Sequence, residues 1–138
     1  MAAAFACLFG SVPTVAAQPG ALEGVWRSGT STLRITVKGT EARAQFVEVG
    51  PEARNLGFKP GELSFVGSVV ENYVHGIQTI RYGGACHPNG RKTPIIGRLT
   101  PNGQTLAIHH YAISVDNNCR DTGQYEIAQT LWRRAAGR

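Results

Sequence analysis

Hydrophobic and polar residues alternate along most of the chain, and short turn signals rich in glycine, proline and asparagine interrupt the alternation. A period of two residues is typical of β-strands that bury one face. No helical period of useful length is present. The polar segment 52–61 is the one place where a helical turn is expected. The segments predicted as strands are 24–28, 33–37, 42–49, 63–69, 74–82, 94–99, 104–115 and 125–133.

Eight short strands with short connections indicate an all-β, antiparallel, up-and-down barrel, with a sandwich as the alternative. The cysteines favour the barrel. If the strands alternate in direction, segments 74–82 and 104–115 finish at the same rim, and Cys86 and Cys119 each follow one of those ends by four residues. We therefore expect one disulfide, Cys86–Cys119. Because His87 follows Cys86, a metal-binding or catalytic thiol is the alternative.

Residues 1–17 carry no charged side chain and end in the small residues Val15, Ala16 and Ala17. This pattern predicts a signal peptide cleaved before Gln18, and a buried N-terminal helix is the alternative. Residues 18–138 would then form a single barrel domain in the periplasm or the medium. Removing the leader removes Cys7 and leaves an even pair of cysteines, which fits an exported protein.

The composition limits the class of protein and the kinds of partner that the chain can have. The chain of 138 residues is 42% hydrophobic and 17% charged, which excludes a disordered tail. Its formal net charge is +5, yet aromatic residues make up only 8% and no basic run exceeds two residues, so we expect no nucleic acid partner. Arg91, Lys92 and Arg120 would lie on one rim, where they could attract an anionic ligand, a membrane surface or an acidic protein. A solvated surface without a partner is the alternative.

Two short motifs stand at the ends of the predicted barrel, Gly24-Val25-Trp26 and Trp132-Arg133-Arg134. They resemble the motifs of calycin-like small β-barrels, which include lipocalins, avidins and small bacterial protease inhibitors. The resemblance implies that Trp26 packs across the barrel floor under Arg133 or Arg134, a cation–π contact. Trp132 would be a neighbour of that pair or an outward anchor. The resemblance implies a fold and no activity.

Polar residues inside the predicted strands are the candidates for a binding site. Strand alternation sends His109 and His110 to opposite faces, which argues against a zinc site built from His75 and both of them. We expect no metal, no cofactor and no catalytic residue, and structural or solvent-facing roles are the alternative for these side chains. The predicted ligand-binding residues are Trp26, Gln78, Tyr82, His109, Tyr111, Gln129 and Arg133.

The sequence thus favours an exported, monomeric, non-catalytic barrel that holds a small apolar or amphipathic ligand, with an anionic end drawn by the basic rim. Two alternatives stay open. The first is an inhibitor or interaction module for a hydrolase, which would use residues 18–23 and the 52–61 loop. The second is a small barrel enzyme with a cavity histidine as its base.

Overall fold

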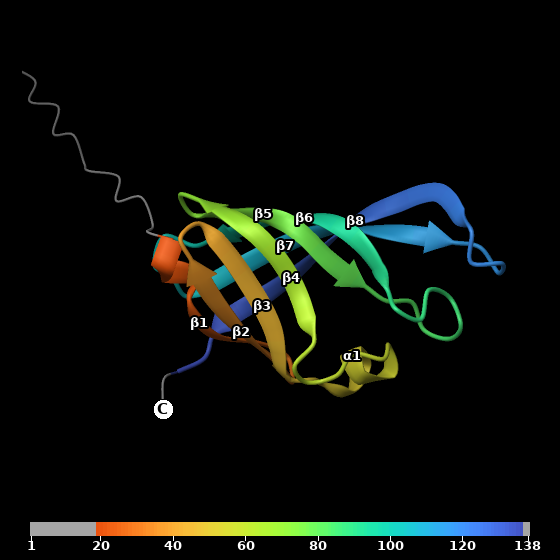
Figure 1. The fold of residues 1–138 in the computed structure, drawn as a ribbon, viewed down its shortest axis with the longest axis horizontal. Helices are drawn as coiled ribbons and strands as arrows, with labels where there is room; N and C mark the ends of the chain where they lie inside the picture. Colours follow the sequence, from red (N-terminus) through yellow and green to blue (C-terminus); the bar gives the residue numbers. More distant parts are fainter. Residues whose placement is uncertain (1–18, 137–138) are drawn as a thin grey trace, which may run out of the picture.

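The computed structural model describes residues 19–136, which form a closed antiparallel barrel of eight strands (Figure 1). The strands follow one another around the barrel in chain order, and β8 pairs with β1 to close it. The predicted fold class is confirmed, whereas the predicted leader, residues 1–17, lies outside the described residues. The strands are β1 Gly24–Ser28, β2 Ser31–Lys38, β3 Glu41–Glu48, β4 Leu63–Val70, β5 Tyr73–Ile80, β6 Arg91–Leu99, β7 Thr105–Val115 and β8 Asp121–Arg134.

Two short helices complete the described chain. The 3-10 helix η1 spans Pro19–Leu22 at one end of the barrel, and α1 spans Pro51–Asn55 at the other (Figure 1). Helix α1 falls where the sequence predicted a helical turn. No helix among the described residues has the length and apolar character needed to cross a membrane.

The hairpin of β7 and β8 is longer than the sequence predicted. Strand β8 begins at Asp121 rather than at residue 125, and β6 begins at Arg91 rather than at residue 94. These two starting residues form an ion pair, with Arg91 Nη2 lying 3.1 Å from Asp121 Oδ2. This contact joins segments that are distant in the sequence, and local alternation carries no sign of it. Strand β5, in contrast, ends two residues early, at Ile80.

The barrel is packed at one end and hollow at the other. The closed end carries η1 and the turns β2–β3, β4–β5 and β6–β7, and the open end carries the other four connections. Along β7, inward-facing Leu106 and Ile108 are buried, whereas His110 and Ala112, nearer the open end, are only half-buried. The fully buried side chains include Trp26, Leu33, Ile35, Phe65, Val74, Leu99, Leu106 and Ile108.

Trp26 forms the floor of the closed end. Its indole is fully buried, and Nε1 donates a hydrogen bond to the carbonyl of Leu22 at 2.9 Å. The guanidinium of Arg134 stacks on the ring, 4.4 Å from the centroid, and donates to the carbonyls of Ala21, Glu23 and Gly103. Of the two arginines that the resemblance left open, Arg134 therefore covers the tryptophan, which ties η1 and the β6–β7 turn to the floor.

The disulfide joins two connections at the open end. Cys86 and Cys119, 33 positions apart, are bonded as predicted. His87 Nε2 lies 3.1 Å from the carbonyl oxygen of Cys119, so the β5–β6 loop and the tip of the β7–β8 hairpin are joined twice. The disulfide pairing confirms that β5 and β7 finish at the same rim.

Candidate functional site

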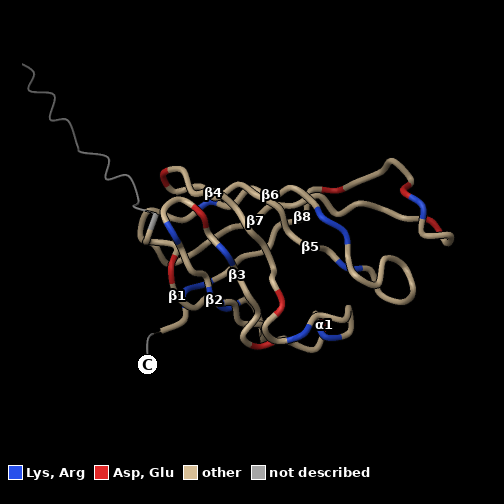
Figure 2. The backbone as a smooth tube through the Cα atoms, in the orientation of Figure 1, with Lys and Arg blue, Asp and Glu red and all other residues tan. Residues whose placement is uncertain are grey.

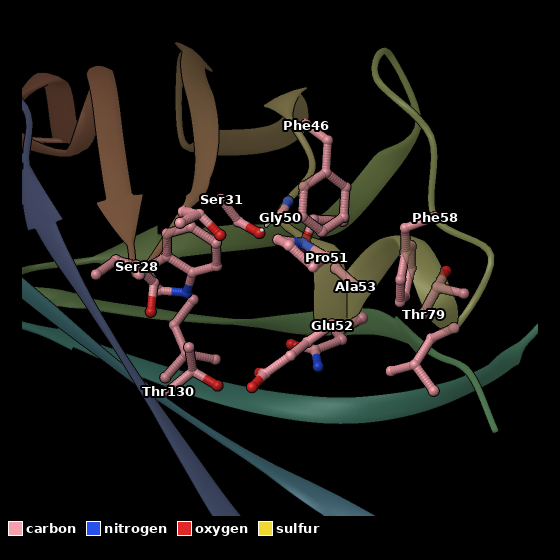
Figure 3. Close-up of a pocket in the computed structure, with 17 residues that line it drawn as sticks. Ser28, Ser31, Phe46, Gly50, Pro51, Glu52, Ala53, Phe58, Thr79 and Thr130 are labelled. Atoms are coloured by element: carbon pink, nitrogen blue, oxygen red, sulfur yellow. Dashed lines mark hydrogen bonds between the residues drawn. The ribbon is translucent and has the colours of Figure 1, made fainter. Parts of the chain in front are cut away.

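A pocket of about 670 Å³ occupies the open end of the barrel (Figure 3). It lies among the β1–β2 turn, the end of β3, the segment that contains α1, and residues of β4, β5, β7 and β8. Its volume lies in the range of pockets that hold small organic molecules. The residues that line it include Ser28, Thr30, Ser31, Phe46, Glu52, Phe58, Ser64, Gln78, Thr79, Ile108, Thr130 and Trp132.

The chemistry of the lining is apolar with many hydroxyl groups. Phe46, Ile108 and Trp132 supply apolar surface, and serine and threonine side chains from five elements supply uncharged polar groups. Glu52 is the one charged residue among those that line the pocket. In Figure 3 its carboxylate points toward Thr130 across the cavity. The arrangement favours a molecule with an apolar body and uncharged hydrogen-bonding groups.

Gly50 allows the α1 segment to approach the β1–β2 turn closely. A Cβ atom at this position would collide with Thr30 Oγ1 and lie 3.1 Å from Ser31 Oγ, so the absence of a side chain is a steric requirement. The backbone N–H of Gly50 donates to Ser31 Oγ at 3.0 Å. The close approach and this bond fix the start of α1 at the edge of the pocket.

Arg81 holds the rest of the α1 segment over the barrel mouth. Its guanidinium donates to both carboxylate oxygens of Glu62, at 3.1 and 3.3 Å, and to the carbonyls of Gly57 and Pro88. It also stacks on Phe58, 5.0 Å from the ring centroid. Because this side chain is only 17% exposed, the ion pair is better shielded from water than a surface pair. Arg81 thus joins the segment after α1, the start of β4 and the β5–β6 loop.

The sequence-predicted ligand residues divide among several places. Gln78 lines the pocket, whereas Trp26 lies in the closed-end floor. Tyr82 is half-buried beside His87, with 5.6 Å between ring centroids, and its hydroxyl is buried without a hydrogen-bond partner among residues 19–136.

The other predicted residues lie on the outer face of the barrel. Gln129 Nε2 is 2.9 Å from His109 Nε2, and Tyr111 packs edge-to-face on Tyr125, with 4.9 Å between centroids. Arg133 is exposed opposite Arg27. The structure therefore does not gather the seven predicted residues into one cavity, and a role for each in ligand binding stays a prediction.

The pocket also contains residues that the sequence analysis did not select. Trp132 lines the pocket and is not an outward anchor. It is two residues from Arg134 on β8, so both side chains lie on the inward face of that strand. Its position in the closing motif, two residues before Arg134, was the available signal. Phe46 and Phe58 pack on each other, with 5.2 Å between ring centroids. Their contact depends on the loop conformation, which no local pattern predicts.

His110 is the inward-facing histidine, and its burial has a consequence for stability. Its Nδ1 atom is buried without a hydrogen-bond partner in the described part of the chain, and burial lowers the pKa of the imidazole. An unfolded chain would bind a proton near pH 6.5, whereas the folded protein resists protonation to lower pH. In that interval the unfolded state binds more protons, so the free energy of unfolding falls as the pH is lowered from 7 toward 5.

We expect His110→Gln to flatten this part of the stability profile, as measured by urea unfolding at a series of pH values. His75→Gln is the matched control, because His75 is an exposed histidine on β5. An unchanged slope in the His110 variant would show that another group titrates there. Asp121 does not interfere, since the Gly123 N–H and then Arg91 lower its pKa and move its effect to more acidic conditions.

The described residues contain no group of three or more histidine, cysteine, aspartate or glutamate side chains that could hold a metal ion. By its fold the chain is an eight-stranded closed barrel compatible with the calycin-like architecture, with a pocket at its open end. No known protein-family model matches the sequence. No curated protein matches it either.

Proposed function

We propose that the protein is an exported, non-catalytic binding protein that holds a small apolar or amphipathic molecule at the open end of the barrel. The observation that carries this proposal is the pocket of about 670 Å³, whose floor is apolar and whose walls carry hydroxyl groups. The charge-free leader pattern and the disulfide support export.

The polar end of the ligand is proposed to be uncharged. The sequence predicts a basic rim that attracts an anion. The residues that line the pocket do not include those of the rim, Arg91, Lys92 and Arg120. Arg91 is paired with Asp121, and Lys92 Nζ donates to Thr79 Oγ1 at 2.7 Å. Hydroxyl groups and Gln78 instead offer both donors and acceptors to a neutral ligand.

The two alternative functions have less support. Residues 19–22, proposed as part of an inhibitory arm, form η1, where Leu22 is buried and Arg134 binds the carbonyls of Ala21 and Glu23. For an enzyme with a cavity base, no histidine is among the residues that line the large pocket. Both alternatives remain predictions from the sequence.

The test is a fluorescence titration of the purified protein with the neutral apolar probe N-phenyl-1-naphthylamine. Thr130→Trp fills the pocket beside its floor, and we expect at least about a tenfold loss of probe affinity because the bulky ring takes the ligand's space. Thr36→Trp is the control, since Thr36 is exposed on β2 and outside the pocket lining.

Native mass spectrometry of the protein taken from its own host would identify a retained ligand. Failure of the wild type to bind the probe, together with a ligand-free native mass, would defeat the proposal. Equal probe affinity in both tryptophan variants would place the binding site elsewhere.

A further inference from the structure

The outer wall of the barrel carries charged residues on β2 and β3 and near the ends of β6 and β8, with apolar side chains between them on β5–β8. Outward positions on β2 and β3 include Arg34, Lys38, Glu41 and Arg43. In contrast, β4, β5 and β7 carry no charged residue at all, and Figure 2 shows their long uncharged stretches. Most large hydrophobic side chains that are exposed in the described chain lie on β5–β8. There they are Ile77, Ile96, Tyr111, Tyr125, Ile127 and Leu131, which we call the outer patch.

Strand register makes the outer patch continuous. Tyr111 lies opposite Ile127, and its other neighbour is Pro94, which is paired with Ile77. This apolar row crosses four strands. Ile96, His109 and Gln129 form the next row toward the closed end. The side chains of the patch are 39–66% exposed, so each leaves much of its apolar surface in water.

The size of the outer patch matches one side of a dimer interface. Six large side chains at about half exposure present on the order of 500 Å² of apolar surface. A standard interface buries roughly 800 Å² per partner, of which about 65% is apolar in homodimers. The patch therefore supplies nearly the whole apolar core of such an interface, at the upper end of what a monomer leaves exposed.

The patch carries both hollows and protruding side chains. Two hollows, of about 240 and 230 Å³, flank Tyr111 and share Pro94 in their walls. On the same face Ile127 and Tyr125 protrude, at 66% and 60% exposure. A two-fold interface brings one patch against its own copy, so it requires protrusions and hollows on the same surface.

The polar groups of the patch favour a protein over a lipid surface. The hydrogen-bonded pair of His109 and Gln129 lies in the middle of the face and would carry unused donors and acceptors into hydrocarbon. Cationic residues on β6 stand toward the two ends of the face: Lys92 is paired with Thr79 near the open end, and Arg98 is paired with Ala107, the register partner of Leu131, near the closed end. A mainly apolar face with a few hydrogen-bonding groups and charged residues at its edge is the ordinary anatomy of a protein interface.

We propose that the outer patch is the interface of a homodimer, in which two barrels pack wall against wall. The outer patch consists of side chains on the barrel wall, so the two copies would associate through these side chains and not through strand pairing. The proposal departs from the monomer expected from the sequence, and it does not depend on what the pocket binds.

The test is sedimentation velocity and size-exclusion chromatography with light scattering, on the purified protein over a wide concentration range. We expect a concentration-dependent dimer in the wild type. Ile127→Glu places a charge in the centre of the interface and should weaken dimerisation by at least about tenfold. Ile96→Lys is a second, independent variant. Val47→Glu is the control, because Val47 is 42% exposed on β3, away from the patch, and should leave the dimer intact.

Circular dichroism and thermal unfolding would verify that each variant retains its fold. A wild type that stays monomeric at every concentration would overturn the proposal. A dimer that survives both patch variants would move the interface to another surface. Cosedimentation of a monomer with vesicles of phosphatidylglycerol and phosphatidylcholine, abolished by Ile127→Glu, would also overturn it and identify the patch as a membrane contact.

Discussion

Replacing Trp26 by alanine is expected to lower the free energy of unfolding by about 3–5 kcal/mol, the range for a large buried aromatic side chain. The indole is fully buried at the closed end, and three interactions depend on it. It contributes apolar burial, the hydrogen bond to Leu22, and the surface on which Arg134 stacks. The substitution leaves a cavity where the first and last strands and η1 meet.

Arg134 distinguishes this floor from ordinary core packing. Its guanidinium binds three backbone carbonyls and the indole face together, a geometry that suits the planar fork of arginine. We expect Arg134→Lys to keep the charge and still destabilise the fold, because an ammonium group cannot reproduce the stacking and the fork. Arg133→Lys is the matched control, since the neighbouring arginine is exposed opposite Arg27 and should change stability by less than about 0.5 kcal/mol.

Urea unfolding followed by circular dichroism measures all three variants, and constant slopes would show that the same transition is compared. If Trp26→Ala does not fold, Trp26→Phe gives a smaller loss in the same direction. A loss of less than about 1 kcal/mol for Trp26→Ala would contradict the role of Trp26 as the residue that closes the barrel floor.

The fold could be predicted because its signals are local. Alternation with a period of two, and turns such as Pro101-Asn102-Gly103, located all eight strands within a few residues at most ends. Sequential antiparallel order then placed Cys86 and Cys119 at one rim. Trp26 and its covering arginine came from a resemblance at the two chain ends, and register alone selected Arg134 over Arg133.

The site could be predicted only in part. Its residues are set by which face of each strand points inward and by the conformation of the loops. A shift of one residue in a strand exchanges its inner and outer faces, so sequence alone could not choose between His109 and His110. The structure turns His110 inward and pairs His109 with Gln129 on the outside. The α1 segment reaches the mouth through contacts of Gly50 and Arg81 with distant parts of the chain. No local pattern records those contacts.

The outer patch could not be predicted from the sequence either. Each of its strands alternates as a half-buried strand should, but several outward positions are apolar as well, for example Ile96 beside Ile95. In a single strand such pairs indicate only a strongly hydrophobic segment. Once the register aligns four strands, the outward apolar residues form one surface.

Removing the disulfide is the second change that we expect to lower stability strongly. Its effect on local opening should be largest at the open end and smallest at the closed end. Cys86→Ser with Cys119→Ser is expected to lower the free energy of unfolding by about 2–4 kcal/mol, because the unfolded chain gains the entropy of an opened loop. The wild type in reductant should behave like the double variant, whereas the double variant should not respond to reductant.

Local opening should be confined to the rim that the disulfide joins. Without it, the β5–β6 loop and the tip of the β7–β8 hairpin keep the contact of His87 with the Cys119 carbonyl and the ion pair of Arg91 with Asp121. Exposed pairs of this kind contribute little, so amide hydrogen exchange should rise around residues 82–90 and 114–122. The closed end, held by Trp26 and Arg134, should exchange only through global unfolding. Equal acceleration at both ends would mean that the barrel opens as one unit and that the disulfide does not act locally.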